Sequence, residues 1–299
     1  MAERWIVETS ELRKSYDNVE ALRGLNLQVP AGSICGFLGR NGVGKTTTMK
    51  ILLGMTRPTA GEARVFGLPA AAPASSVEIR GRTAFVSEEK DLYPYMTVEE
   101  MVRFTTAFSP RWRTDLQQRY LRTFELPLER KVKSLSRGMR TKLALLLALC
   151  RGAELLVLDE PTAGLDPAMA EEILQILVGH VADGEMTVLF SSHQIAEVEQ
   201  IADRVTIIDR GREVVTGSLD DLRENFCRIQ FAFDGDAPAA VFHSAAVVRV
   251  WRRGRVLTVL SREGAQPVVD EARALNPISV EVTPVTLKDI FLESVMVED

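Results

Sequence analysis

The segment 39–46 matches a phosphate-binding loop, G-x-x-x-x-G-K-[ST], at every defining position. Its glycines allow backbone N–H groups to face a polyphosphate, and Lys45 adds a full positive charge. The hydroxyl of Thr46 can hold Mg²⁺. The apolar run 34–38 predicts a buried strand before the loop, and residues 45–53 predict a helix after it, which is the context that such a loop requires. The sequence therefore predicts a nucleotide site.

Two adjacent carboxylates end a second apolar run. Residues 155–158 predict a buried parallel strand, and Asp159 and Glu160 follow it directly. Two carboxylates are costly to bury unless a cation or a reacting water lies beside them. We assign Asp159 to the magnesium ion and Glu160 to the general base that activates the attacking water. The alternative is an acidic pair that simply leaves a strand end into solvent.

The motif Leu135-Ser136-Arg137-Gly138-Met139 precedes leucines at helical spacing, and here the chain resembles the ATP-binding subunits of ABC transporters. The signature of that family is usually LSGGQ. Ser136 and Gly138 stand at its serine and second glycine, whereas Arg137 and Met139 replace its first glycine and its glutamine. A serine at a helix start can offer its hydroxyl and nearby N–H groups to a γ-phosphate. Without the other motifs, Ser136 would be read only as the N-cap of an amphipathic helix.

The resemblance extends over most of the first 220 residues. It implies that Tyr16 stacks on the adenine, a contact worth about 1–3 kcal/mol. It also implies that Asp166 lies in the loop between two subunits. His193 follows the apolar run 188–190 and two serines. It matches the histidine that contacts the γ-phosphate in the family.

One position departs from the family, which commonly has a glutamine after the strand predicted at 83–86. We assign Glu88 to that role, with Glu89 as the alternative. A carboxylate can reach Mg²⁺ or a water, but its charge alters how the site senses the γ-phosphate. In the family this neighbourhood receives a short helix of the membrane partner, so we expect docking at 88–96. The alternative is a loop that packs on its own domain.

The expected cofactors are ATP and Mg²⁺. The predicted cofactor-binding residues are Tyr16, Gly39, Arg40, Asn41, Gly42, Val43, Gly44, Lys45, Thr46, Thr47, Ser136, Gly138 and Asp166. The predicted catalytic residues are Glu160, His193 and Glu88, and the predicted metal-binding residues are Thr46, Asp159 and Glu88.

Composition indicates a cytoplasmic protein. The formal net charge of −5 gives no general attraction to nucleic acid or to an anionic membrane surface, so we expect no nucleic-acid partner. Cys35, Cys150 and Cys227 lie in apolar settings without the spacing of a metal site, which favours a reducing compartment. The longest apolar run, 143–150, is far shorter than the roughly 20 residues that cross a bilayer.

A chain of 299 residues exceeds the usual size of one core, so we expect two domains, 1–225 and 226–299. The resemblance implies that the first is a P-loop α/β domain. It would have a mostly parallel sheet, an antiparallel β part and a helical insert at about 95–150. Alternating apolar residues and helical patterns after residue 226 predict a small α+β domain without a catalytic motif.

Three classes of function fit these features. The first is the ATPase of an exporter, because the stretch 283–293 resembles the C-terminus of ATPases whose membrane component is a separate chain. It would act peripherally on the inner face of the membrane, with a polytopic permease. The second is an ABC ATPase that drives a membrane complex without transport, and the third is a soluble ABC protein of translation or DNA maintenance.

The family also implies a second ATPase subunit. One signature and one phosphate loop occur in the chain, and the family completes each site across a head-to-tail dimer. Ser136 and Gly138 would then face the nucleotide of the other subunit, with Asp166 between them. A homodimer and a heterodimer both satisfy this expectation.

Overall fold

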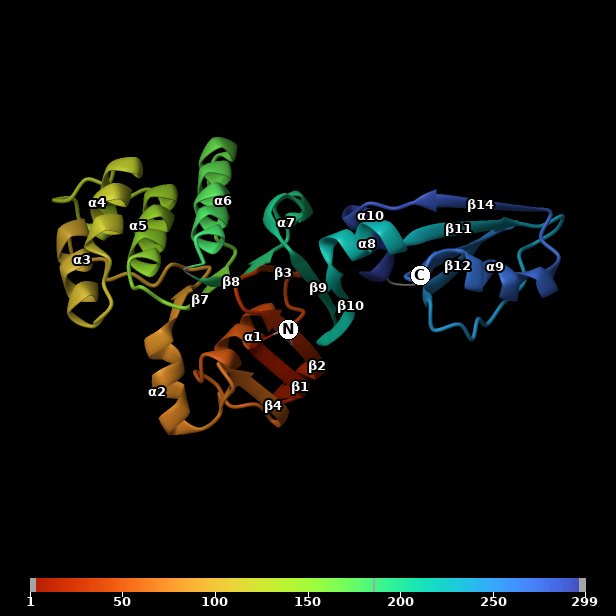
Figure 1. Ribbon diagram of the computed structural model, residues 1–299, viewed down its shortest axis with the longest axis horizontal. Helices are drawn as coiled ribbons and strands as arrows, with labels where there is room; N and C mark the ends of the chain where they lie inside the picture. The colour runs from red at the N-terminus through yellow and green to blue at the C-terminus, as the bar shows by residue number, and fades with distance from the viewer. Residues whose placement is uncertain (1–3, 185, 296–299) are drawn as a thin grey trace. The chain divides into compact units, whose positions relative to one another are not determined.

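The computed structural model describes residues 4–184 and 186–295. The chain divides into two compact units, Met1–Glu213 and Val214–Asp299 (Figure 1). The domain limits 1–225 and 226–299 stay predictions, and their outer ends, residues 1–3 and 296–299, lie outside the described residues.

A six-stranded sheet has the order β10-β9-β3-β8-β7-β6, and all of its strands except β10, which continues past Glu213, lie within the first unit. Its strands are β3 (Ile34–Leu38), β6 (Thr83–Val86), β7 (Leu155–Asp159), β8 (Thr187–Ser192), β9 (Arg204–Asp209) and β10 (Arg212–Ser218). The pairs β3–β8, β3–β9, β6–β7 and β7–β8 are all parallel, so the carboxyl ends of these strands meet at one edge. Strands β3, β7 and β8 are completely buried, as their apolar runs predict.

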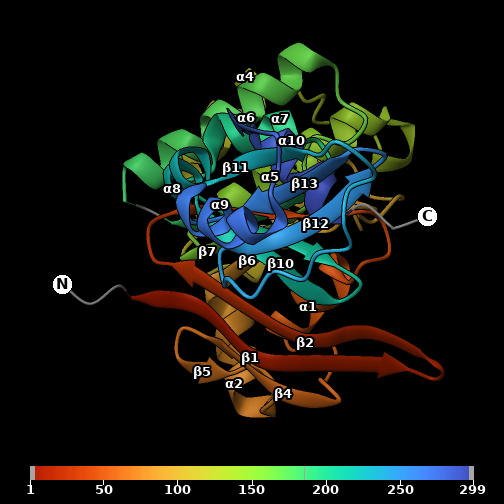
Figure 2. The ribbon, with the colours of Figure 1, turned by 90° about the vertical axis from the view of Figure 1, so that its right-hand side faces the viewer.

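A second sheet in this unit is antiparallel and has the order β2-β1-β4-β5. Its strands are β1 (Trp5–Tyr16), β2 (Val19–Pro30), β4 (Ala60–Val65) and β5 (Leu68–Pro69). Figure 2 shows β1 and β2 as the long red ribbons. Leu25 and Val65 from this sheet share one buried core with Phe37 and Leu189 from the parallel sheet. The core fixes the position of the loop after β3, because helix α1 contributes Met49 to it.

The helices of the first unit include a separate helical insert. The helices outside the insert are α1 (Lys45–Leu52), α2 (Pro73–Arg82), α6 (Pro167–Ala182) and α7 (Ile195–Ile201). The insert consists of α3 (Val98–Ala107), α4 (Thr114–Thr123), a 3-10 turn (Val132–Ser134) and α5 (Arg137–Leu149). Thr97 and Glu100 form a capping box at the start of α3. These elements confirm the predicted α/β class and the insert.

The second unit is an α+β unit with a sheet in the order β12-β13-β11-β14. Its strands are β11 (Cys227–Ala232), β12 (Val247–Arg253), β13 (Val256–Ser261) and β14 (Ser279–Pro284). Its helices are α8 (Leu219–Asn225), α9 (Gln266–Ala272), a 3-10 turn (Arg273–Leu275) and α10 (Leu287–Val295). Ile229, Phe231 and Val259 pack with Val268 of α9 in a core of their own. Across the described part of the chain, no helix has both the length and the apolar character needed to cross a membrane.

Candidate functional site

The phosphate-binding loop connects β3 to α1, as predicted. Gly42 and Gly44 have φ of 82° and 113°, a region that L side chains rarely adopt. A Cβ at Gly44 would also lie 2.6 Å from Leu22 Cδ2 and 2.8 Å from the carbonyl oxygen of Ala21. Gly44 is the N-cap of α1, where it has no side chain to bond the first N–H groups of the helix. The loop therefore presents N–H groups and the positive end of a helix dipole.

Lys45 is buried at the centre of this loop. Its Nζ donates to the carbonyl oxygens of Gly39 at 2.6 Å and Arg40 at 3.3 Å, and it lies 3.8 Å from Oε1 of Glu160. Burial lowers the pKa of Lys45, and the nearby carboxylates, Glu160 first, oppose that shift. Of the other loop residues, Arg40, Asn41, Gly42 and Thr46 are exposed, and Val43 and Thr47 are half-buried.

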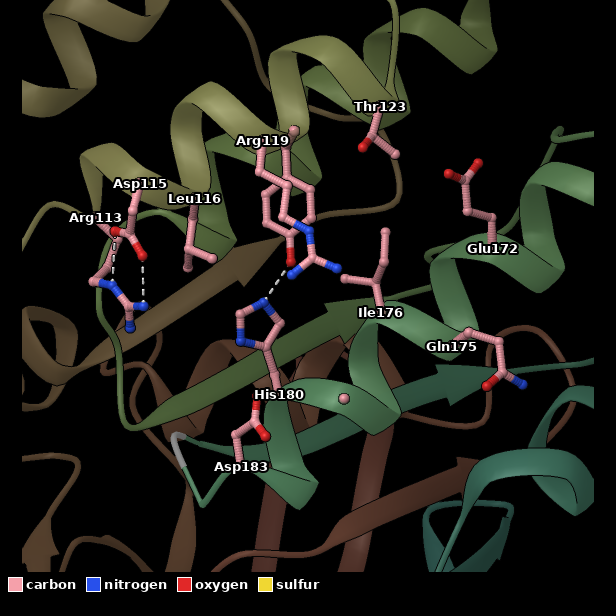
Figure 3. A pocket seen from close by; sticks show the side chains of 12 residues that line it. Arg113, Asp115, Leu116, Arg119, Thr123, Glu172, Gln175, Ile176, His180 and Asp183 are labelled. Atoms are coloured by element: carbon pink, nitrogen blue, oxygen red, sulfur yellow. Dashed lines mark hydrogen bonds and ion pairs between the residues drawn. The ribbon is translucent and has the colours of Figure 1, made fainter.

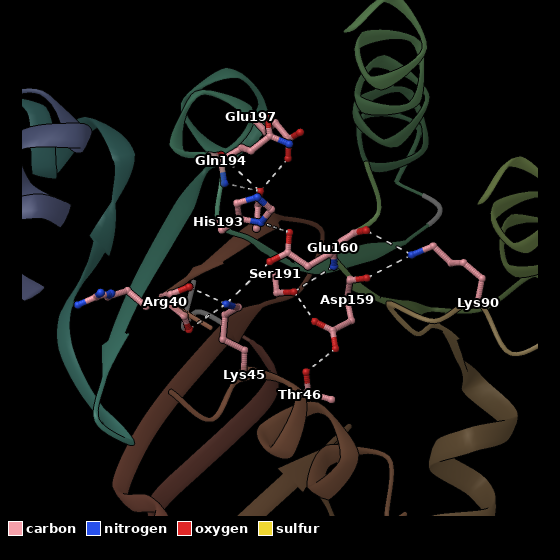
Figure 4. A network of polar contacts seen from close by, with 12 residues as sticks. Arg40, Lys45, Thr46, Lys90, Asp159, Glu160, Ser191, His193, Gln194 and Glu197 are labelled. Atoms are coloured by element: carbon pink, nitrogen blue, oxygen red, sulfur yellow. Dashed lines mark hydrogen bonds and ion pairs between the residues drawn. The ribbon is translucent and has the colours of Figure 1, made fainter. Parts of the chain in front are cut away.

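Asp159 lies at the end of β7, directed at Thr46. The Thr46 hydroxyl donates to Oδ2 of Asp159 at 2.6 Å, and the Ser191 hydroxyl donates to Oδ1 at 2.6 Å (Figure 4). Ser191 is the register partner of Asp159 on the parallel strand β8. A hydroxyl and a carboxylate are hard oxygen ligands, and Mg²⁺ takes few of these from the protein and the rest from waters and phosphates. Thr46 and Asp159 therefore fit a magnesium ion bound with a nucleotide.

Glu160 follows Asp159 with a left-handed backbone, φ 50°, and only 5% of the residue is exposed. Its Oε2 lies 2.7 Å from Nδ1 of His193. Its Oε1 is buried and has no hydrogen-bond partner among the residues that the structure describes. The backbone N–H of Glu160 donates to the Ser191 hydroxyl at 3.1 Å, which fixes the residue beside Asp159. One carboxylate oxygen is thus held by His193, and the other can accept a proton.

Glu88 lines a cavity of about 540 Å³ together with Thr46 and Asp159. Glu89 lines the same cavity. Both candidates for the position at which the family commonly has a glutamine therefore lie at the wall of this cavity. The structure therefore brings the three predicted metal-binding residues to one cavity.

Lys90 is a member of this cluster that the sequence reasoning missed. Its residue is 8% exposed, and its Nζ donates to the carbonyl oxygens of Asp159 at 3.4 Å and Glu160 at 3.2 Å. Burial lowers the pKa of Lys90 to about 8, although the charges of Asp159 and Glu88 act in the opposite direction. Its only signal in the sequence was its position two residues after Glu88.

The remaining predicted residues lie at the ends of other elements. Tyr16 ends β1 with 43% of its surface exposed, and the Nζ of Lys14 lies 4.7 Å from its ring centre. Ser136 is the N-cap of α5 and accepts a hydrogen bond from the Met139 N–H at 3.2 Å, which agrees with the alternative reading of this serine. Asp166 is likewise the N-cap of α6. Gly138 lies in the first turn of α5.

A larger cavity, about 680 Å³, lies between α4 and α6 and contains none of the predicted residues (Figure 3). Its buried polar groups already have partners. The hydroxyl of the buried Tyr120 lies 2.7 Å from Nε2 of the buried His180. Arg113 and Asp115, which are not buried, pair with each other at 2.8 Å. We therefore assign the chemistry to the cluster around Asp159 and not to this larger cavity.

Comparisons with known proteins agree with this geometry. The family model described as "ABC transporter" matches residues 22–163. The Nod factor export ATP-binding protein I of Ralstonia nicotianae is 32% identical, covering 96% of this chain and 92% of that protein. The bacitracin transport ATP-binding protein BcrA of Bacillus licheniformis is 29% identical, covering 96% of each.

A solved structure described as the ATP-binding subunit of an ABC transporter is also similar. It is 29% identical, has a TM-score of 0.67 and covers 73% of this chain and 92% of its own. The Nod factor export protein matches nearly the whole of this chain at 32% identity, which establishes the family. The chain belongs to the ATP-binding subunits of ABC transporters, and it is an ABC-type ATPase.

Proposed function

We propose that the chain powers an exporter, by ATP-driven dimerisation coupled to a separate membrane permease. The observation that carries hydrolysis is the cluster in which Lys45, Thr46 and His193 surround the buried carboxylates of Asp159 and Glu160. The export direction is supported by the relatives named for Nod factor export and bacitracin transport.

In this proposal the loop 39–46 binds the β- and γ-phosphates of ATP. Its N–H groups face the phosphate oxygens, and Lys45 exchanges the carbonyl oxygen of Gly39, now 2.6 Å away, for a phosphate oxygen. The residues Thr46 and Asp159 would hold Mg²⁺, which neutralises charge on the phosphates when bound. Glu88 lines the same cavity and would contact the ion or a water there. Tyr16 stacks on the adenine with its exposed ring.

Glu160 acts as the general base. Its Oε1 accepts a proton from water as the water oxygen attacks the γ-phosphorus, and the bond from that phosphorus to the bridging oxygen breaks to release ADP. His193 keeps the other carboxylate oxygen in place through its 2.7 Å contact, and its exposed ring contacts the γ-phosphate. The side chain is therefore oriented before the substrate arrives.

The complete site needs a second ATPase subunit, either another copy of this chain or a related protein. Ser136 and Asp166 accept hydrogen bonds from the Met139 and Met169 N–H groups of α5 and α6, and Gly138 lies in the first turn of α5. They are free to meet a nucleotide held by a partner. We propose that residues 1–225 form this ATP-binding domain and that residues 226–299 stabilise or tune the dimer.

The permease would dock on residues 88–96, which places the chain at the inner face of the cell membrane. Tyr93 and Tyr95 are exposed, and the ring of Tyr93 packs edge-on against Phe104 at 5.3 Å. Phe104 lies in turn 5.1 Å from the exposed ring of Phe108. Exposed aromatic side chains of this kind are typical of interface centres. The same segment reaches the hydrolysis site, so docking of the permease can be coupled to ATP hydrolysis.

The test is recovery of the partner from solubilised membranes by the tagged full chain. The native chain should recover a polytopic membrane protein, and the double variant Tyr93→Ala/Tyr95→Ala should recover much less. A matched control, Val241→Ala, changes an exposed apolar residue of the second unit. Equal recovery by both chains would reject the docking site, and no recovery by the native chain would reject the separate permease. A second test addresses the direction of transport. Cells that carry Glu160→Gln should accumulate, inside the cell, the compounds that the native transporter exports. Reduced accumulation inside these cells would indicate import.

A further inference from the structure

Lys90 joins two segments that are far apart in the sequence. It lies in the turn after β6, and the two carbonyl groups that its Nζ bonds, those of Asp159 and Glu160, are 69 and 70 residues away. These carbonyls belong to the peptide units directly after the two acidic side chains. A cation held there restrains the backbone from which both carboxylates project.

The position of Lys90 has a cost that its contacts must offset. The side chain is buried, although a lysine is rarely buried without partners. The backbone at Lys90 has φ 54°, and Glu160 has φ 50°, both in the left-handed region that disfavours residues with a Cβ. Two strained residues joined by one ammonium group are held in place by that contact.

The charges around Lys90 are mixed. Asp159, Glu88 and Glu160 favour its charged form, whereas Arg137 disfavours it. The ammonium group is therefore placed where it can offset negative charge beside the base without bonding either carboxylate directly. Its hydrogen bonds to carbonyl oxygens need a donor at the end of a long side chain, which methionine lacks and arginine has.

We propose that Lys90 is a positioning residue for ATP hydrolysis, which holds the carbonyl groups of Asp159 and Glu160 so that the Glu160 carboxylate faces the attacking water. This inference rests on the proposed role of Glu160 as the general base. Lys90 acts through the backbone of Glu160, whose carbonyl oxygen its Nζ bonds at 3.2 Å. It also ties the base to the segment 88–96, so that movement of that segment changes the orientation of Glu160.

The test compares purified full-length chains with ATP as the substrate. Lys90→Met should lower kcat by about 10- to 100-fold and change KM by less than about twofold, because an aligned base is lost but the phosphate loop is intact. Lys90→Arg should recover most of kcat. The matched control is Lys131→Met, an exposed lysine of the helical insert, which should behave as the native chain.

A double variant separates positioning from general damage. If Lys90 acts through Glu160, adding Lys90→Met to Glu160→Gln should lower kcat no further. The inference would be overturned if the two substitutions lowered kcat independently, so that their effects multiplied in the double variant. It would also be overturned if Lys90→Met kept the native kcat or changed only KM, by raising it. If Lys90→Met does not fold, a comparison of Lys90→Gln with Lys90→Arg tests the inference instead, because only the glutamine variant should have a lower kcat. A native chain without ATPase activity would instead refute the proposed function.

Discussion

Replacement of the Glu160 carboxylate by an amide tests the hydrolysis site most directly. Glutamine has nearly the same shape, and its oxygen can keep the contact that Oε2 of Glu160 makes with Nδ1 of His193 at 2.7 Å. The side chain is buried, and its other oxygen has no hydrogen-bond partner in the described residues, so the amide replaces it without breaking a bond there. The variant should therefore fold normally and lose the base together with its ion pair with Lys45.

The expected losses differ between hydrolysis and binding. Loss of a general base lowers kcat by about 10²–10⁴, or about 3–5 kcal/mol of transition-state stabilisation. The Kd for ATP should not rise, because the removed charge lies 3.8 Å from Nζ of Lys45 and competes with the phosphates for that lysine. A slow enzyme that still binds ATP should accumulate in its ATP-bound, dimeric form.

The assay combines phosphate release, ATP binding and light scattering on the purified chain. Glu129→Gln, an exposed carboxylate in the helical insert, is the matched control and should keep the native kcat. A native kcat in Glu160→Gln would show that another group is the base. A low kcat accompanied by lost ATP binding would also contradict the reasoning, because the defect would then lie in binding.

Three further changes test other parts of the first unit. Lys45→Ala should weaken ATP binding by at least about tenfold in a fluorescence titration, since it removes a charge-assisted phosphate contact; unchanged binding would contradict its role. Tyr120→Phe should lower the free energy of unfolding by about 0.5–1.5 kcal/mol in urea, because it removes the 2.7 Å contact between the buried Tyr120 hydroxyl and Nε2 of His180. Cys150 should resist alkylation at pH 8 in the folded chain, since burial raises the pKa of its thiol to about 12, and should react once the chain is unfolded.

Much of the parallel sheet could be predicted because its strands are buried on both faces. Runs such as 34–38 and 155–158 have no polar residue, and the structure confirms both as completely buried strands. The N-cap position of Ser136, the alternative to its predicted contact with a γ-phosphate, could also be read from the sequence, because serine is a preferred residue at a helix start. The helix after the phosphate loop ends at Leu52 instead of the predicted residue 53.

The partners of the acidic pair could not be predicted in the same way. Ser191 lies 32 residues from Asp159 and became its partner only through the register of β7 and β8. Lys90 carries no local pattern at all, since its bonds go to backbone carbonyl groups that are present at every residue. The sequence shows which side chains can do chemistry, whereas the groups that orient them depend on strand order.

The charges of the assembled site explain why these orienting groups matter. Asp159, Glu160 and Glu88 all act on the two buried lysines, Lys45 and Lys90. A polyphosphate that enters beside three carboxylates meets repulsion, which two lysines and a bound cation must offset. Lys45 bonds the carbonyl oxygens of Gly39 and Arg40 in the phosphate loop, whereas Lys90 bonds those of Asp159 and Glu160. The charge that binds ATP is thus on Lys45, and the charge that positions the base is on Lys90. A substitution of Lys90 can therefore change kcat without changing the affinity for ATP.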